Sequence, residues 1–258
     1  IESVKSISAN NLSNRINTDN IPSEINELVA TFNQLLSNLE ESFKKITDFS
    51  NNPSHELKTP LTVIRGEIEV ALKQERKPQE YKEILKDILE ESISIQKIIN
   101  QLLFLAKKDT GELKSNFEEL YLDEIIIDTI LQIEKFALTK NIDVKVKKII
   151  PSTIYANETL LEIAINNLLR NAIIYSKNNT HIDIYMDENS KEYLLKIEDR
   201  GCGISDEDLP FIFERFYRAD KARSRKEGGT GLGLAIVKMI LDIHHYDIEV
   251  ESTQDMGT

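Results

Sequence analysis

The sequence predicts a multidomain α and α/β protein, in which a long helical hairpin is followed by an α/β layer domain. Two observations predict this fold class. Apolar residues recur at heptad-like helical spacing from residue 28 to residue 105. Beyond about residue 115, helix-like and strand-like segments alternate, as they do in an α/β layer fold. The stretch from Asp109 to Asn116 is the expected boundary between the two parts.

The hairpin is predicted from two apolar stripes joined by a turn. The first helix starts at Pro22 and carries a narrow seam that continues to about Lys73. Charged flanks favour a coiled coil here, although a helix packed in a globular core would show a similar pattern. Gln74–Pro78 reads as a turn, and the second helix ends near Lys107. Its stripe consists of Ile84, Ile88, Ile95, Ile98, Leu102 and Leu105. A lone hairpin cannot cover its own stripe, so two copies should form a four-helix bundle.

The second half alternates between helical and extended patterns. We expect helices over residues 123–138, 158–175 and 231–244, and strands over residues 142–149, 181–187, 192–198 and 248–250. Residues 205–230 are polar and basic, and we expect this stretch to be mobile.

Bulk composition narrows the function. A chain of 258 residues, 40% of them hydrophobic, can build one large or two ordinary domains. The net charge of −12 argues against a nucleic-acid partner. The single cysteine, Cys202, excludes an internal disulfide and a multi-cysteine metal site. No apolar run reaches about 18 residues and no signal-peptide pattern opens the sequence, so we expect no membrane span in it.

The block Ser54-His55-Glu56-Leu57-Lys58-Thr59-Pro60-Leu61 carries the first chemical signal. It places His55, Glu56 and Thr59 one or four residues apart on one helical face. A neutral imidazole is nucleophilic near physiological pH. A histidine on a charged helix is more often a solvated side chain, so its interpretation depends on the rest of the chain.

Three segments in the second half together indicate a nucleotide site. Asn167 and Asn171 lie four residues apart on one helix, and an amide oxygen can join a magnesium shell that phosphates complete. Asp199 precedes Gly201, so a carboxylate that can accept from an adenine amino group sits beside permissive backbone. Gly229–Gly233 opens a helix, where phosphate binds favourably. Each signal is weak alone, but their combination predicts phosphoryl transfer from ATP to His55.

These segments resemble the sequence boxes of the membrane-bound sensor histidine kinases of two-component signalling. S-H-E-L-K-T-P-L resembles the phosphoacceptor box, and N-N-L-L-R-N-A-I-I-Y-S resembles the asparagine box. D-R-G-C-G-I and G-G-T-G-L-G-L-A-I-V-K resemble the two glycine boxes, and F-I-F-E-R-F-Y-R-A-D resembles the phenylalanine box between them. Residues 7–43 look like the later part of a HAMP linker.

The resemblance implies three parts. Residues 1–43 would be a partial HAMP linker and signalling helix, and residues 44–110 a dimerisation and histidine phosphotransfer hairpin. Residues 111–258 would be a catalytic ATP-binding domain, a two-layer α/β sandwich of the GHKL (Bergerat) type. The family continues past Thr258 into a final strand, so we expect that strand to be missing. We also expect this to be the cytoplasmic fragment of an inner-membrane (cytoplasmic-membrane) protein.

The resemblance also implies a mechanism. His55 would attack the γ-phosphate of ATP, and Glu56 would accept a hydrogen bond from the other ring nitrogen. The phosphoryl group would then pass to an aspartate of a response regulator. Thr59 occupies the position that helps to orient water for dephosphorylation of the regulator, so phosphatase activity is a further expectation. The implied partners are a second copy of the chain and that regulator.

The implied cofactors are ATP and Mg²⁺. Asn171 would be the magnesium ligand with Asn167 assisting, Tyr175 would stack on adenine, and Asp199 would read its amino group. Two arginines would neutralise phosphate charge. The whole nucleotide-binding set is Asn167, Asn171, Tyr175, Asp199, Gly201, Gly203, Arg218, Arg223, Gly229, Thr230, Gly231, Leu232 and Gly233.

Some positions depart from the family pattern, and two rival functions follow from the same residues. Pro53 stands where a small or apolar residue is usual, and Ile174 where a phosphate-contacting lysine is common. A kinase-like adaptor without catalysis is one rival, and a hydrolytic ATPase of the same fold is the other. The hydrolytic relatives carry a glutamate where this chain has Asn167, and an amide cannot act as a base, which counts against hydrolysis.

Overall fold

The computed structural model describes residues 56–73, 77–107, 116–189, 192–219 and 229–258. The chain divides into two compact units, residues 1–91 and 92–258. In the first unit, residues 56–72 are helical. The helix α3 (Pro78–Ala106) begins in the first unit and ends in the second.

Helix α3 confirms the predicted second helix of the hairpin. Pro78 stands at its first position, where a missing N–H costs nothing, and Glu80 in its first turn suits the positive end of the helix dipole. The six residues of the predicted stripe are all buried or half-buried, and Phe104 is half-buried as well. A second set of large apolar residues is more than half exposed: Leu85, Leu89, Ile93 and Leu103.

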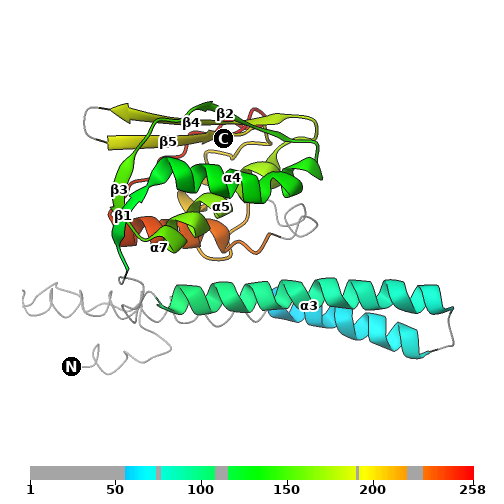
Figure 1. The fold of residues 1–258 in the computed structure, drawn as a ribbon. Coiled ribbons are helices and arrows are strands. Elements are labelled where there is room, and N and C mark those ends of the chain that lie inside the picture. The colour runs from blue at the N-terminus through cyan, green and yellow to red at the C-terminus, as the bar shows by residue number, and fades with distance from the viewer. Residues whose placement is uncertain (1–55, 74–76, 108–115, 190–191, 220–228) are drawn as a thin grey trace, which may run out of the picture. The chain divides into compact units, whose positions relative to one another are not determined.

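The remainder of the second unit is an α/β layer structure (Figure 1), in which a three-stranded sheet covers a layer of helices. The helices are α4 (Leu122–Leu138), α5 (Glu158–Tyr175) and α7 (Gly233–His244). The three-stranded sheet has the order β2-β4-β5, with β2 (Asp143–Lys148) parallel to β4 (His181–Asn189) and β5 (Glu192–Glu198) antiparallel to β4. A separate two-stranded antiparallel sheet pairs β1 (Glu118–Tyr121) with β3 (Thr153–Ala156).

Two apolar clusters hold the second unit together. The larger one lies between the sheet and the helices α4 and α5, with Ile182, Ile184 and Met186 of β4 fully buried in it. The smaller one joins α5 to α7 and includes Leu105 of α3. Side chains alternate between the two faces of a strand, so His181, Asp183 and Tyr185 lie on the opposite face of the sheet, where Asp183 is also buried.

Most predicted elements of this half are confirmed, and one is wrong. Helix α5 has the predicted bounds, and α7 begins two residues later than predicted. Residues 248–250 were expected to be a strand, but they form no strand, because their backbone pairs with none of the described strands. The pattern did not predict β1 or β3. Part of the stretch 205–230 is an ordered 3₁₀ turn, Leu209–Phe211.

Several expectations lie outside the described residues. They concern the seam of the first helix before residue 56, the HAMP-like stretch 7–43, the turn around residue 75, and Pro53. Among the described residues, no helix combines the length and the apolar character needed to cross a membrane.

Candidate nucleotide-binding site

Helix α5 presents the three polar or aromatic side chains predicted for the site. Asn167, Asn171 and Tyr175 follow one another at four-residue spacing and are all half-buried. The start of α5 is fixed because the side chain of Asn157 accepts a hydrogen bond from Leu160 N (3.0 Å). The Asn157 N–H also donates to Nε2 of His244 (3.1 Å), which ties α5 to the end of α7.

The glycine-rich turn before α7 lies against these asparagines. A Cβ on Gly233 would come within 3.1 Å of Asn167 Oδ1 and 3.9 Å of Asn171 Oδ1, so glycine permits this close approach. Gly231 has a positive φ of 70°, and a Cβ there would lie 2.7 Å from the Phe216 backbone. Phe216 N donates to Gly231 O (2.8 Å). The turn thus opens helix α7 close to the α5 amides, and the backbone N–H groups at a helix start are donors that a phosphate can use.

These elements line one pocket of about 80 Å³. Seven of the predicted residues line it: Asn167, Asn171, Tyr175, Gly229, Thr230, Gly231 and Gly233. Ile174, noted above as standing where a phosphate-contacting lysine is common, also lines it. Residues that were not assigned to the site from the sequence complete the lining: Lys97, Gln101, Arg170, Ile212, Tyr217 and Leu234. Helix α3 contributes two of them, and no sequence motif marks either one.

Asp199 lies in a turn that abuts the end of α5. Its carboxylate accepts a hydrogen bond from Gly201 N (2.7 Å), and its own N–H donates to Thr258 O (2.9 Å). A Cβ on Gly201 would lie 2.5 Å from Tyr175 O, so the turn packs directly on the α5 C-terminus. Burial raises the pKa of Asp199 above its usual value, against the lowering effect of backbone hydrogen bonds to its carboxylate from Gly201 and Thr258.

The buried hydroxyl of Ser176 is an unused polar group next to this turn. Ser176 is bridged to Gly201, and its Oγ has no hydrogen-bond partner among the described residues. An orphaned buried hydroxyl is costly, and it is satisfied when a polar ligand or water binds beside it. Ser176 and Asp199 are thus two buried polar side chains at this turn, although neither lines the nucleotide pocket.

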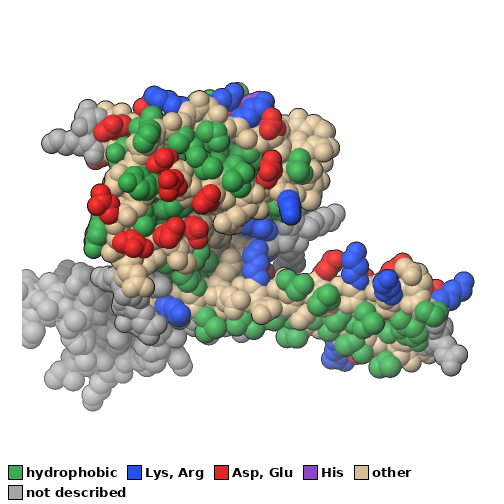
Figure 2. All heavy atoms as spheres, viewed as in Figure 1, with side chains coloured by type: hydrophobic (Ala, Val, Ile, Leu, Met, Phe, Trp, Pro, Cys, Tyr) green, Lys and Arg blue, Asp and Glu red, His purple; other side chains and the backbone are tan. Residues whose placement is uncertain are grey.

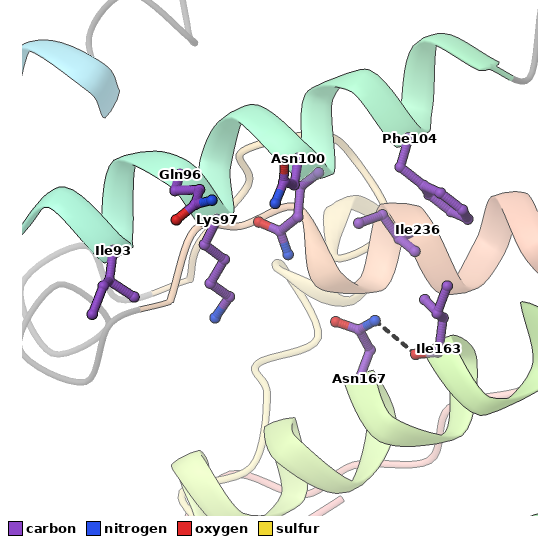
Figure 3. A pocket seen from close by; sticks show the side chains of 9 residues that line it. Ile93, Gln96, Lys97, Asn100, Phe104, Ile163, Asn167 and Ile236 are labelled. Carbon is purple, nitrogen blue, oxygen red and sulfur yellow. Dashed lines mark hydrogen bonds between the residues drawn. The ribbon is translucent and has the colours of Figure 1, made fainter. Parts of the chain in front are cut away.

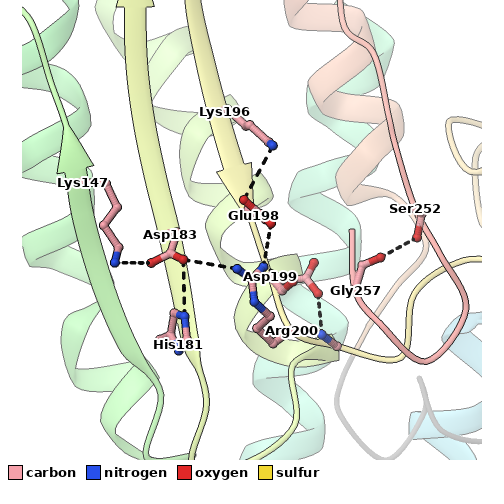
Figure 4. A network of polar contacts seen from close by, with 10 residues as sticks. Lys147, His181, Asp183, Lys196, Glu198, Asp199, Arg200, Ser252 and Gly257 are labelled. Carbon is pink, nitrogen blue, oxygen red and sulfur yellow. Dashed lines mark hydrogen bonds and ion pairs between the residues drawn. The ribbon is translucent and has the colours of Figure 1, made fainter.

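A network of charges fixes the same turn from the outer face of the sheet (Figure 4). Arg200 contacts Glu198 at 2.8 Å and Asp183 at 3.3 Å. The side chain of Asp183 is 5% exposed and also contacts Lys147 (3.5 Å) and His181 (3.3 Å). Arg200 immediately follows Asp199, so this network holds the backbone that positions the predicted adenine-reading carboxylate.

The donor set fits a magnesium ion only when a nucleotide brings part of the coordination shell. Among the described residues, no cluster of three or more His, Cys, Asp or Glu could hold a metal alone. The Asn171 amide oxygen faces the glycine-rich turn. One amide oxygen with phosphate oxygens and waters makes a chemically normal magnesium shell.

The other predicted residues lie elsewhere or outside the described chain. His55 and Arg223 are outside the described residues. Glu56 and Thr59 lie on the helical segment 56–72 of the first unit. Leu232 is fully buried in the smaller apolar cluster. Gly203, with a φ of 64°, packs against Thr253, and neither it nor Asp199, Gly201 or Arg218 lines the pocket itself.

Two protein-family models match the chain. Residues 45–111 match the His Kinase A (phospho-acceptor) domain. Residues 156–258 match the histidine kinase-, DNA gyrase B-, and HSP90-like ATPase domain. The first match includes His55, and the second includes Asn167, Asn171 and Asp199.

Curated relatives align with nearly the whole chain. The probable sensor kinase SilS of Salmonella typhimurium is 33% identical over 96% of this chain and 51% of its own length. The sensor protein CzcS of Cupriavidus metallidurans is 32% identical over 100% of this chain and 54% of its own length. The signal transduction histidine-protein kinase ArlS of Staphylococcus aureus is 34% identical over 91% of this chain and 52% of its own length. The chain thus spans about half the length of these relatives.

Solved structures agree in fold. The Acinetobacter baumannii histidine kinase AdeS matches with a TM-score of 0.56 and 24% identity, covering 73% of this chain and 86% of that structure. Full-length ShkA matches with a TM-score of 0.60 and 19% identity, covering 79% and 42%. The described helices are followed by the ATPase α/β fold, as in those proteins. With both domain types matched in this order, the chain belongs to the sensor histidine kinases of two-component signalling.

Proposed function

We propose that this chain is the catalytic part of an ATP-dependent protein-histidine kinase that phosphorylates itself on His55. One observation carries the proposal: the α5 amides and the glycine-rich turn before α7 meet at one pocket, and Gly233 lets the turn approach Asn167 Oδ1. That arrangement suits phosphate and a magnesium ion. The ShkA structure with the similar fold was solved in complex with AMPPNP, an ATP analogue, which supports ATP as the ligand.

The proposed roles of the site residues follow this geometry. Asn171 would ligate Mg²⁺, which would offset the negative charge of the phosphates, and Asn167 would assist. Tyr175 would stack on adenine while Asp199 accepts a hydrogen bond from its amino group. The glycine-rich turn would bind phosphate through backbone N–H groups, and Arg218 and Arg223 would neutralise its charge.

The proposed reaction is nucleophilic attack by a ring nitrogen of His55 on the γ-phosphorus. The N–P bond forms as the bond between that phosphorus and the bridging oxygen to the β-phosphate breaks, which releases ADP. Glu56 would orient the ring through its other nitrogen and stabilise the positive charge on it. The phosphoryl group would then move to an aspartate carboxylate of a response regulator. Thr59 would serve a phosphatase reaction on that regulator.

The amide of Asn167 favours this transfer over ATP hydrolysis. The Asn167 side-chain nitrogen Nδ2 donates a hydrogen bond to Ile163 O (2.7 Å), which fixes the orientation of the amide. An amide has no basic site that could take a proton from water. The site is therefore better equipped to pass phosphate to a held imidazole than to activate water.

Helix α3 supports the proposed homodimer. Figure 2 shows hydrophobic side chains gathered along the helices, and Leu85, Leu89 and Leu103 of α3 are each more than half exposed. Apolar residues at helical spacing gain stability when another helix covers them. A four-helix bundle made from two hairpins would cover this set.

We propose the domain limits 1–43, 44–110 and 111–258 for the linker remnant, the phosphotransfer hairpin and the catalytic domain. The family matches at residues 45–111 and 156–258 support the last two. Relatives named as sensor kinases are about twice as long as this chain. We place the chain on the cytoplasmic side of an inner-membrane sensor, since sensor histidine kinases carry their kinase part there.

Incubation with γ-labelled ATP and magnesium tests the proposal. The chain should take up label that is lost in acid and kept in base, and a His55→Ala variant should take up none. Binding of ATP without any label would favour the adaptor function. Release of labelled inorganic phosphate with no protein-bound label would favour hydrolysis.

A further inference from the structure

A second, larger pocket of about 440 Å³ lies next to the nucleotide pocket, entirely within the second unit. Helix α3 forms one wall, and α5 and α7 contribute Ile163, Asn167 and Ile236 (Figure 3). Lys97, Gln101 and Asn167 line both pockets, so the two spaces are continuous at these side chains. In Figure 3 the Lys97 side chain extends from α3 toward α5.

Two cationic side chains, Lys97 and Arg170, meet at this junction. Lys97 and Arg170 both line the nucleotide pocket, and no Asp or Glu lines either pocket among the described residues. Over that same part of the chain, neither cation has a carboxylate within ion-pair distance, and Arg170 instead lies over the Phe136 ring at 4.5 Å. Desolvation by the surrounding protein and, second, repulsion from Arg170 lower the pKa of the Lys97 ammonium. An anion between the two cations would remove that repulsion.

The position of Lys97 is set by a contact one turn along α3. Thr230 Oγ1 donates to Gln101 Oε1 (2.9 Å) and accepts from Leu232 N (3.3 Å). Gln101 is four residues after Lys97, so both side chains lie on the same face of α3. This hydrogen bond fastens that face to the glycine-rich turn, the segment expected to bind phosphate.

We propose that Lys97 of α3 is a binding residue for the polyphosphate chain of ATP. The proposal rests on the proposed kinase function and adds a cation that no motif of the nucleotide-binding domain supplies. Arg170 and Lys97 would flank the phosphates from opposite helices. A lysine ammonium suits this task because it is a compact point charge on a flexible stem that can follow phosphate oxygens. Ile174 also lines this pocket, but its aliphatic side chain has no donor and no charge to offer to a phosphate oxygen.

The test compares Lys97→Met with Lys86→Met, an exposed lysine on the same helix that lines neither pocket. Affinities of the full chain for Mg-ATP and for adenosine are measured by calorimetry. The charged contact predicts that Lys97→Met binds ATP about tenfold more weakly, whereas adenosine affinity stays unchanged. Lys86→Met should match the parent chain for both ligands.

Three results would overturn the proposal. If Lys97→Met binds ATP as tightly as the parent, the ammonium does not contact phosphate and the kinase proposal is untouched. If it loses ATP and adenosine affinity equally, the side chain only shapes the pocket. If the parent chain binds no ATP at all, this inference fails together with the proposed function.

Discussion

The guanidinium of Arg200 lies 3.3 Å from the carboxylate of Asp183, a side chain that is 5% exposed. Arg200 belongs to the turn after β5, and Asp183 lies on the neighbouring strand β4. A buried carboxylate needs polar partners to offset its desolvation, and Lys147 and the His181 ring also contact it. The pair therefore anchors the turn that carries Asp199 to the central strand of the sheet.

Removing the charge of Asp183 should destabilise the α/β domain. Asp183→Asn removes the negative charge that Arg200 and Lys147 share, and we expect it to lower the free energy of unfolding by about 1–3 kcal/mol, less than for a fully buried pair because both cations are partly exposed. Urea titration measures the change. Asp187→Asn on the same strand is the control, since its pair with Lys148 is exposed to solvent and should contribute much less to stability. Equal effects would contradict the anchoring role.

His244 should make the domain less stable in acid. It is 7% exposed, its Nδ1 lies 2.8 Å from Ile240 O, and Nε2 accepts from Asn157 N–H, so the ring is held neutral. Burial lowers the pKa of His244 below its ordinary value. The unfolded chain therefore binds this proton more tightly than the folded chain does. Because of this group, the free energy of unfolding falls as the pH drops below about 6.5, and above that pH His244 has no effect on its pH dependence.

Unfolding titrations at pH 7.5 and pH 5.5 measure this effect. His244→Gln should reduce the difference between the two pH values. Repulsion from the exposed neighbour His245 is a smaller cause of the same pKa shift, so His245→Asn, at a φ of 58° that asparagine tolerates, should reduce the difference less than His244→Gln does. An unchanged pH dependence in His244→Gln would show that other groups cause it.

Loss of the Asn171 amide should weaken Mg-ATP binding. Its oxygen faces the glycine-rich turn, and a contact to a charged partner is worth about 1.5–3 kcal/mol, or about 10- to 100-fold in affinity. Calorimetry on Asn171→Ala measures the loss. Asn178→Ala, at an exposed turn position, should bind as the parent does. Binding that persists in Asn171→Ala but disappears with a chelator would place the metal on other ligands.

Gly233→Ala should separate binding from stability. The new Cβ would lie 3.1 Å from Asn167 Oδ1 and would displace that amide. The affinity for ATP should therefore fall several-fold, which corresponds to about 1 kcal/mol of lost binding free energy. Alanine has a higher helix propensity than glycine, which should offset the crowding in the folded state. The free energy of unfolding should therefore change little.

Gly66→Ala is the matched control for this substitution. A Cβ on Gly66 meets nothing within 4 Å, so the variant should gain about 0.5–1 kcal/mol and bind ATP normally. Thermal unfolding and calorimetry on both variants make the comparison. Unchanged ATP affinity in Gly233→Ala would show that the close approach to Asn167 has no role in binding.

The sequence predicted the long elements well because their signals are local. Helix α5 has its capping residue Asn157 directly before its apolar repeat, and its bounds were predicted correctly. The strands β1 and β3 are four residues each, too short for an alternating pattern to be distinguished. The segment 248–250 has strand-forming residues but no ladder partner, and pairing is a property of the tertiary structure.

The candidate site shows the same division. Asn167, Asn171 and the glycine-rich turn were predicted, because each belongs to a motif with a physical reason for its spacing. Lys97 and Gln101 were not, because they are ordinary polar residues of a long helix until folding brings them beside α5 and α7. The sequence around a lysine on a solvated helix face does not indicate whether that lysine binds an anion.

The most direct test of the central claim is to map the phosphorylated residue. After incubation with Mg-ATP, the chain is kept at neutral or basic pH, digested, and its fragments are sequenced by mass spectrometry. The kinase function predicts phosphate on His55, within the segment Ser54–Leu61, and none there in Asn171→Ala. Phosphate on another residue of that segment, such as Ser54 or Thr59, or an unmodified His55 in a chain that binds ATP, would contradict it.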